Sequence, residues 1–376
     1  MASNKEKMKF IEYEKMQNSF SRLIVTKEME KAEWTVTEKI HGANFSFHIN
    51  KDEVKVARRR DFLNENENFF NHLDAEFMRT YPEKMRQVFE DVVKRYTDKQ
   101  IKHITVWGEI FGGHYKVDGE TLKGVKKCSP VQLEVLYTPN IEWVAYDISY
   151  KTADSETTKQ EYLDYDVALD VFKTYEIFHL KPLFVGKMNE ALDYNLKFDS
   201  TLPKILGFPE LPKGSNIVEG VVAKPMKNLK CTDQYDEETR AIVKLKNPGF
   251  TETKPMPKAR DAKKGGKPPK LISKIMTYAT EARLNNAISK HGAPTKDEVI
   301  KRIVKEFVDD IFEDIETEDG DLYREWKRKA EKAKIKTMIA SKANGLINRR
   351  LTLQGDIEVP GVIMDSIISE STTTER

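Results

Sequence analysis

TEKIHGANFSF, residues 37–47, joins a lysine to a strand-like run through a single glycine. From Ala43 onward apolar and polar residues alternate, which is the pattern of a half-buried strand. Lys39 is therefore either the charged tip of an ordinary strand or a nucleophile placed beside one. The spacing Lys-x-x-Gly cannot decide between these, because chance puts it in many chains of this size. The surrounding sequence has to supply the decision.

Runs rich in β-branched and aromatic residues surround this segment and predict strands. They cover residues 33–40, 43–49, 54–58, 104–111, 141–150, 217–223 and 241–246. Turn-prone residues 50–53 make a hairpin of the second and third runs. Helices are expected at 69–96 and 162–173. The first 250 residues thus predict a domain of the α+β class.

The composition changes near residue 250. Residues 251–270 are basic and rich in proline and glycine, which predicts a linker. Beyond it, Ile275, Tyr278, Ala279 and Ala282 share a helical face, and the pair Thr295 and Glu298 forms a capping box. A third helix is expected at 321–343, and a disordered polar tail at the end. We therefore expect domains at 1–250 and 271–376, joined by the linker.

Overall composition excludes several classes of protein. The chain has 376 residues, and 63 Lys and Arg nearly balance 61 Asp and Glu, for a net charge of +2. Any nucleic-acid surface must therefore come from local charge segregation. Two cysteines make neither a disulfide framework nor a zinc cluster, and no apolar segment is long enough to cross a bilayer. We expect a protein that is not secreted, either cytoplasmic or virus-encoded and intracellular, without membrane association.

Charged residues lie within runs that otherwise have the composition of core strands. They are Glu109 in WGEIFGG, Glu219 in VEGVVAKP, and Lys244 and Lys246 in IVKLK. The two lysines share a face because strand side chains alternate. Each glutamate alone is usually a solvated residue or pairs with a lysine. Burying four such charges unpaired would cost several kcal/mol. A shared nucleoside triphosphate with Mg²⁺ would explain all four together.

The ordered series EKIHGANF, ARRR, WGEIFGG, WVAYDI, VEGVVAKP and IVKLK resembles the covalent nucleotidyltransferases. Among these it is most similar to the RNA ligase 2 family, which includes a bacteriophage nick-sealing enzyme and mitochondrial RNA-editing ligases. The resemblance covers about residues 34–246. It implies an antiparallel-sheet nucleotidyltransferase fold, the ATP-grasp-like fold of DNA and RNA ligases, followed by a small all-helical C-terminal domain.

The resemblance also implies a role for each matching residue. Lys39 would attack the α-phosphorus of ATP and carry AMP. Glu109 would contact the ribose, and Glu219 would organise the metal. Tyr146 would stack on adenine, unless it is a core tyrosine. The remaining implied contacts are Glu38 and Ile40 at the adenine edge, Asn44 after the motif glycine, Arg59 at the phosphate and RNA end, and Lys244 and Lys246 at the phosphates.

Some positions stay open at this stage. Arg58 or Arg60 could replace Arg59, and all three could be a solvated strand end. His41 and His114 are expected to be loop or surface residues, because the family does not require histidine there. Cys128 and Cys231 have no partner at a suggestive spacing, so a thiol nucleophile is not expected.

The implied activity is ATP-dependent joining of RNA 3′-hydroxyl and 5′-phosphate ends, with ATP as AMP donor and Mg²⁺ or Mn²⁺ as metal. The expected partner is nicked or duplex RNA, and the expected protein is a monomer. A DNA ligase or capping-type enzyme is the first alternative, but these follow the same core with an OB-fold barrel. A non-catalytic RNA-binding adaptor is the second, and the joint presence of Lys39, Glu109, Glu219, Lys244 and Lys246 argues against it.

Overall fold

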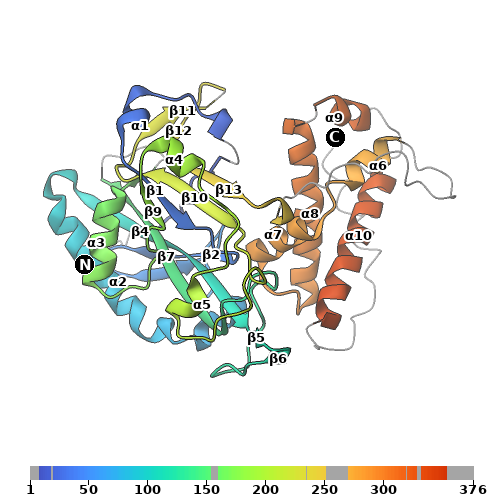
Figure 1. Cartoon of the computed structure of the whole chain (residues 1–376), viewed down its shortest axis with the longest axis horizontal. Coiled ribbons are helices and arrows are strands. Elements are labelled where there is room, and N and C mark those ends of the chain that lie inside the picture. Colours follow the sequence, from blue (N-terminus) through green and yellow to red (C-terminus); the bar gives the residue numbers. More distant parts are fainter. Residues whose placement is uncertain are drawn as a thin grey trace, which may run out of the picture. The chain divides into compact units, whose positions relative to one another are not determined.

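The computed structural model describes residues 8–17, 20–153, 160–233, 235–250, 270–318, 320–327 and 332–353. The chain divides into two compact units, Met1–Gly249 and Phe250–Arg376 (Figure 1). The expected linker, apart from Lys270, and the expected disordered tail lie outside the described residues.

Two antiparallel sheets form the centre of the first unit (Figure 1). The first has the strand order β13 (Val243–Lys246), β10 (Gly220–Pro225), β1 (Trp34–Glu38) and β9 (Phe184–Gly186). The second has the order β3 (Val54–Ala57), β2 (Ala43–Ile49), β4 (Ile101–His114), β7 (Thr138–Thr152) and β8 (Glu161–Tyr162). All seven strands expected from the sequence are present, and β4 and β7 are longer than expected.

Shorter elements complete this unit. Two small hairpins pair β5 (Lys116–Val117) with β6 (Glu120–Thr121), and β11 (Lys230–Thr232) with β12 (Glu238–Arg240). The helices are α1 (Lys27–Lys31), α2 (Phe77–Arg95), α3 (Tyr165–Thr174), α4 (Met188–Leu192) and α5 (Leu202–Ile205). Single 3-10 turns occur at Phe20–Arg22, Phe69–Asp74, Thr97–Lys99 and Pro248–Phe250.

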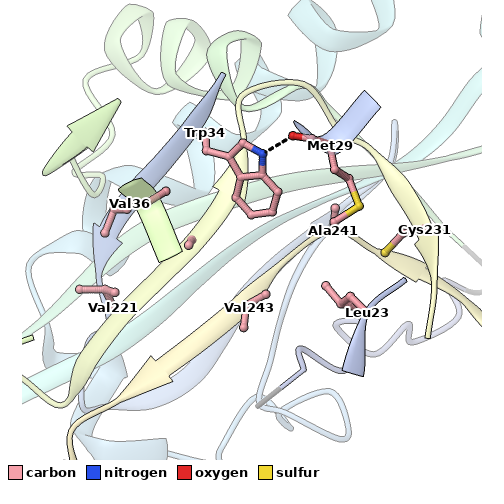
Figure 2. Close-up of a cluster of buried hydrophobic side chains, with 10 residues drawn as sticks. Leu23, Met29, Trp34, Val36, Val221, Cys231, Ala241 and Val243 are labelled. Carbon is pink, nitrogen blue, oxygen red and sulfur yellow. Dashed lines mark hydrogen bonds between the residues drawn. The ribbon is translucent and has the colours of Figure 1, made fainter. Parts of the chain in front are cut away.

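A hydrophobic cluster covers one face of the four-stranded sheet (Figure 2). Trp34 and Val36 of β1 lie in it with Val221 of β10 and Val243 of β13, all fully buried. The Trp34 indole nitrogen donates a hydrogen bond to the carbonyl oxygen of Met29 at 2.8 Å. Because strand side chains alternate, Thr35, Thr37 and the residue after Glu38 point to the other face. The buried cluster therefore determines which face of β1 carries Lys39.

The expected helix at 69–96 is wrong in its first part. A 3-10 turn, Phe69–Asp74, precedes α2, and Phe70 and Asn71 within it have left-handed backbone angles, with φ of 48° and 60°. Left-handed residues cannot continue an α-helix, so α2 begins only at Phe77.

The described part of the second unit is helical. It contains α6 (Lys270–Met276), α7 (Glu281–His291), α8 (Asp297–Glu318), α9 (Gly320–Lys327) and α10 (Lys332–Leu353). No strand occurs among its described residues, so the expected helical domain is confirmed and an OB-fold barrel is not found there. The mixed fold of the first unit likewise confirms the α+β class.

Two expected helices of this unit differ in their limits. Residues 275–282 do not form one face of one helix, because α6 ends at Met276 and α7 begins at Glu281. The Thr280 side chain caps α7 by accepting from the backbone nitrogen of Arg283 at 3.2 Å. The expected helix at 321–343 is two helices, α9 and α10, and residues 328–331 between them lie outside the described residues.

Candidate active site

Lys39 follows the last residue of β1 and reaches a carboxylate. Its backbone nitrogen donates to the carbonyl oxygen of Gly220 at 2.9 Å, which continues the pairing of β1 with β10. Its Nζ lies 2.6 Å from Oε2 of Glu219, and the Lys39 side chain is 18% exposed. The lysine is thus held at the mouth of a buried acidic site rather than projecting into solvent.

Gly42 explains the spacing Lys-x-x-Gly. A Cβ at this position would lie 2.4 Å from the Ile110 carbonyl oxygen and 2.8 Å from Cγ of Glu109. Only glycine therefore lets the chain pass this closely over β4 between Lys39 and β2. The motif brings the end of β1 directly against the strand that carries Glu109.

Lys246 completes a line of residues across three strands. Gly220 lies opposite Lys246 in the pairing of β10 with β13, and on its other side it accepts from Lys39. Lys246 Nζ lies 3.4 Å from Oε1 of Glu219. Lys244, two residues earlier on β13, faces the same side of the sheet. The two lysines expected to bind phosphate therefore share a face with Lys39.

Glu219 is a buried carboxylate whose charge is stabilised by its neighbours. Burial alone would raise its pKa, but Lys39, His41 and Lys246 outweigh that effect and lower the pKa well below the usual value. Glu219 is consequently ionised at neutral pH. It is the carboxylate best suited to a metal among the expected site residues.

Glu109 has the opposite electrostatic state. It lies on β4 directly opposite Asn44 of β2. Burial raises its pKa to about 8, and the nearby charge of Glu219 adds to the rise, although Lys39, His41 and Arg59 oppose it. Glu109 is therefore mainly protonated at neutral pH, so it can donate a hydrogen bond to a hydroxyl as well as accept one.

Tyr146 is anchored at its hydroxyl group. Asn44 Nδ2 donates to the Tyr146 hydroxyl oxygen at 2.7 Å, and the Tyr13 ring meets the Tyr146 ring edge-on at 5.5 Å. The Oδ1 atom of Asn44 is buried and has no hydrogen-bond partner among the described residues. A buried acceptor of this kind requires a donor, and a bound ligand could supply it.

Glu38 and Ile40 flank Lys39 on β1 and just beyond it. The Glu38 carboxylate accepts from the Ser200 hydroxyl at 2.6 Å and from the backbone nitrogen and hydroxyl of Thr201, both at 2.9 Å. Successive strand side chains point to opposite faces, so Glu38 and Lys39 are on opposite sides of the sheet. Glu38 can therefore contact a base stacked on Tyr146 only through its backbone atoms. The side chain of Ile40 is buried.

The three consecutive arginines have different environments. Arg58 is buried and forms ion pairs with Asp61 and Glu67. Arg60 is exposed. Arg59 Nε lies 3.2 Å from Oε1 of Glu12, and its charge opposes part of the rise that burial causes in the pKa values of Glu109 and Tyr146. Arg59 is therefore close enough to Glu109 and Tyr146 to act on their charge, and its contact with phosphate stays a prediction.

His41 is a site residue that the sequence analysis missed. His41 lies in the loop between β1 and β2, as expected, but a surface position is wrong, because its side chain is buried between two glutamates. Its Nδ1 lies 3.3 Å from Glu219 and its Nε2 lies 2.9 Å from Glu134. Burial lowers its pKa, but the two carboxylates outweigh this and raise it. Its position between Lys39 and Gly42, within the motif itself, was the sequence feature that could have identified it as a site residue.

A buried charge network behind Tyr146 was also missed. Asp147 accepts from the Tyr13 hydroxyl at 2.9 Å and lies 3.0 Å from Arg240 and 3.4 Å from Lys224. Burial would raise the pKa of Asp147, but the two cations lower it. Lys224 also donates to the carbonyl oxygen of Tyr146 at 3.0 Å. The network fixes the backbone that carries the expected stacking residue.

A sequence model of the RNA ligase family matches residues 32–246, which is more than half of the chain. A second model, described as T4 RNA ligase 2 C-terminal, matches residues 267–344. The chain belongs to the RNA ligase family. This confirms the expected family and, at the level of the family, the expected enzyme class. The two matched ranges contain all of the site residues expected from the sequence and most of the helices of the second unit.

Named relatives agree with this family. Mitochondrial RNA-editing ligase 2 of Trypanosoma brucei brucei is 25% identical over 359 residues, which cover 82% of this chain and 84% of that protein. Mitochondrial RNA-editing ligase 1 of the same organism is 27% identical over 256 residues, covering 61% of this chain and 52% of that protein. A solved structure of a Naegleria gruberi RNA ligase has 17% identity and a TM-score of 0.35, and the match covers 62% of this chain and 56% of that one.

A metal site in this RNA ligase family member would be built from few protein ligands. Among the described residues no group of three or more His, Cys, Asp or Glu side chains could hold an ion. Mg²⁺ commonly binds through one or two carboxylates together with substrate phosphates. The ionised Glu219 fits that type of site. None of the described helices is long and apolar enough to cross a membrane.

Proposed function

We propose that this protein is an ATP-dependent RNA ligase that joins RNA 3′-hydroxyl and 5′-phosphate ends in three steps. The observation that carries the proposal is the cluster of Lys39, Glu219 and Lys246, in which a lysine nucleophile and a phosphate-binding lysine meet on one buried carboxylate. Arg59, Glu109 and the anchored Tyr146 lie around the same site and suit the rest of a nucleotide.

In the first step, Lys39 Nζ attacks the α-phosphorus of ATP. A nitrogen–phosphorus bond forms, the bond to pyrophosphate breaks and pyrophosphate leaves, and the proton of the amine passes to solvent. Because Lys39 Nζ is engaged with the Glu219 carboxylate at 2.6 Å, this contact must break before the nitrogen can attack. A Mg²⁺ or Mn²⁺ ion held by Glu219 would supply positive charge that stabilises the phosphate oxygens. Lys246 and Lys244 add to that field from β13.

In the second step AMP passes from Lys39 to the 5′-phosphate of RNA, and in the third an RNA 3′-hydroxyl attacks that phosphate and releases AMP. Of the three consecutive arginines, Arg59 is the one whose charge acts on both Glu109 and Tyr146. We propose that it binds the phosphate and the RNA end. We propose that the substrate is nicked or duplex RNA and that the protein works as a monomer. Both cysteines are free thiols, which suits an intracellular compartment.

The alternatives have less support. A DNA ligase or capping-type enzyme would carry an OB-fold barrel after the catalytic domain, whereas α6 to α10 are helices. A non-catalytic adaptor would have no need for the Lys39, Glu219 and Lys246 cluster.

One experiment tests chemistry and substrate together. The full-length protein is incubated with α-labelled ATP and Mg²⁺, and then with 5′-phosphorylated strands presented as nicked RNA, single-stranded RNA or nicked DNA. We expect one acid-labile label per chain at Lys39, followed by sealing of the RNA nick. Labelling without any sealing of RNA would contradict the proposed function, and preferential sealing of nicked DNA would favour the DNA ligase alternative.

A further inference from the structure

A short basic loop stands outside the residues discussed so far. Residues 123–127, KGVKK, lie between β6 and β7 and are here called the 123–127 loop. It contains three lysines and no acidic residue, and all three lysines are exposed. Between them Val125 is 90% exposed. A single exposed apolar side chain is common on protein surfaces, so Val125 matters here only because it lies among three exposed lysines of one loop.

The loop is held in place by its own chain. The Val125 backbone nitrogen donates to Oδ1 of Asn140 at 2.7 Å. A Cβ on Gly124 would lie 2.5 Å from the carbonyl oxygen of Pro139, so this close approach requires glycine. Lys126 Nζ pairs with Asp74 at 3.1 Å. These contacts therefore hold the loop in a conformation that exposes Val125.

The same connection continues into the active site. After the loop, the Val131 backbone nitrogen donates to the carbonyl oxygen of Gly112 at 3.0 Å. Glu134 then pairs with His41 at 2.9 Å, and the Tyr137 hydroxyl accepts from the His41 backbone nitrogen at 2.9 Å. The 123–127 loop thus lies on the segment that contacts the Lys39-to-Gly42 motif. A macromolecule bound by the loop would be positioned with respect to Lys39.

We propose that the 123–127 loop binds the RNA strand beside the reacting ends, with Lys123 and Lys127 on phosphates and Val125 on a sugar or base. This inference rests on the proposed function and adds a substrate-binding surface to it. Lysines neutralise phosphate charge, and an apolar side chain between them packs on the flat or sugar surface of a nucleotide. A protein partner fits less well, because one valine is far smaller than the apolar centre of a stable interface.

The test uses the full-length protein and a nicked RNA duplex. Affinity is measured between about 50 and 200 mM salt for the wild type and for a Lys123→Ala, Lys127→Ala double variant. Each lost phosphate contact reduces the slope of log affinity against log salt by about 0.9, so we expect a slope shallower by roughly 2. Self-adenylylation by the variant should equal that of the wild type, because the substitutions leave Lys39, Glu219 and Lys246 in place.

A matched control removes the same charge elsewhere in the first unit. Lys94 lies in the last turn of α2 and Lys102 near the start of β4, and both are exposed. At about 3.3 Å per residue, the start of β4 is about 40 Å from its end near the 123–127 loop. A Lys94→Ala, Lys102→Ala variant should keep the wild-type slope. Val125→Ser should weaken binding severalfold without changing the slope, because it removes no charge.

Two results would overturn the inference. They are an unchanged slope in the loop variant and an equal change of slope in the control variant. In each case a wild type that still labels Lys39 and seals RNA shows that the proposed function stands and only the loop assignment fails. A wild type that neither labels nor seals would instead contradict the proposed function.

Discussion

Lys39 Nζ and Glu219 Oε2 lie 2.6 Å apart, although 180 positions separate the two residues in the sequence. Glu219 directly precedes β10, which pairs with β1, so the contact results from the sheet register. Glu219 also contacts Lys246 and His41, and one carboxylate therefore organises three cationic or titratable side chains. The contact between Lys39 and Glu219 must break before Lys39 can attack ATP in the proposed reaction.

Replacement of Lys39 should abolish adduct formation. Lys39→Ala removes the nucleophile, and Lys39→Arg should fail as well, because a guanidinium stays protonated and cannot attack. The measurement is incorporation of α-labelled ATP into the protein. Lys51→Ala, at an exposed position of the β2–β3 turn, is the control and should label normally. A labelled Lys39→Ala protein would remove the central claim.

Nucleotide choice should depend on Tyr146 and on the backbone next to Lys39. We expect ATP to be strongly preferred over GTP, because donors and acceptors arranged for one base are left unpaired by the other. Tyr146→Phe keeps the ring and should retain most adduct formation, whereas Tyr146→Ala should weaken ATP binding by about 1–3 kcal/mol. The measurement is KM and kcat for self-labelling with each nucleotide. Comparable labelling by GTP would point to the capping-type alternative.

The two units should be needed for different steps of the reaction. A fragment ending at Gly249, the last residue of the first unit, contains every site residue described here. We expect it to form the Lys39 adduct but to seal nicked RNA poorly, because sealing must also hold two RNA ends in line. Adduct yield and sealing are compared with the full-length chain in one buffer. Equal sealing would assign the helical unit another role, and loss of adduct formation would place it within the catalytic fold.

Glu109 should make stability depend on pH. Its pKa is about 8 in the folded protein and about 4.3 in an unfolded chain. Because the folded pKa is raised, the stabilising contribution is complete below pH 4 or so and is lost progressively as pH rises towards about 8. The glutamine side chain of Glu109→Gln cannot ionise, so the variant should not lose stability in this way. Its free energy of unfolding should exceed that of the wild type by roughly a few kcal/mol at most.

The measurement is the free energy of unfolding without nucleotide or metal, between about pH 5 and pH 9. The stability of the variant relative to the wild type should increase with pH up to about pH 8. Glu90→Gln, at an exposed position of α2, is the control and should show no such trend. A difference between Glu109→Gln and wild type that does not change with pH would be inconsistent with a protonated Glu109.

Asp147→Asn should be strongly destabilising. The substitution leaves Arg240 and Lys224 buried without their carboxylate, and breaking a buried ion pair costs about 3–5 kcal/mol. Tyr13→Phe keeps all three charged groups and removes the hydrogen bond that the hydroxyl donates to Asp147 and the one that it accepts from Arg240, so it should cost about 1.5–3 kcal/mol. Denaturant unfolding measures both. Equal stability of Asp147→Asn and wild type would show that the network does not stabilise the fold.

The amino-acid sequence by itself determined the main strands and the set of candidate residues. Alternation placed Lys244 and Lys246 on one face of β13, and composition identified the α+β unit and the helical unit. The order of the motifs predicted that Lys39, Glu109 and Glu219 lie near one another, and the structure brings them together, while their catalytic roles stay predictions. These inferences succeeded because alternation and turn chemistry are local properties, which neighbouring residues in the chain largely decide.

Only the tertiary structure decided which groups meet. The β1–β10 register brought Glu219 to Lys39, and the connection before β7 placed Glu134 against His41. The buried cluster around Trp34 and Val36 fixed the face of β1 to which Glu38 points, opposite to that of Lys39. Local pattern also failed at Phe70 and Asn71, where left-handed backbone angles end a helical run. Contacts between residues far apart in the sequence depend on how the strands pair, and that pairing is selected by burial of the whole core rather than by any single segment.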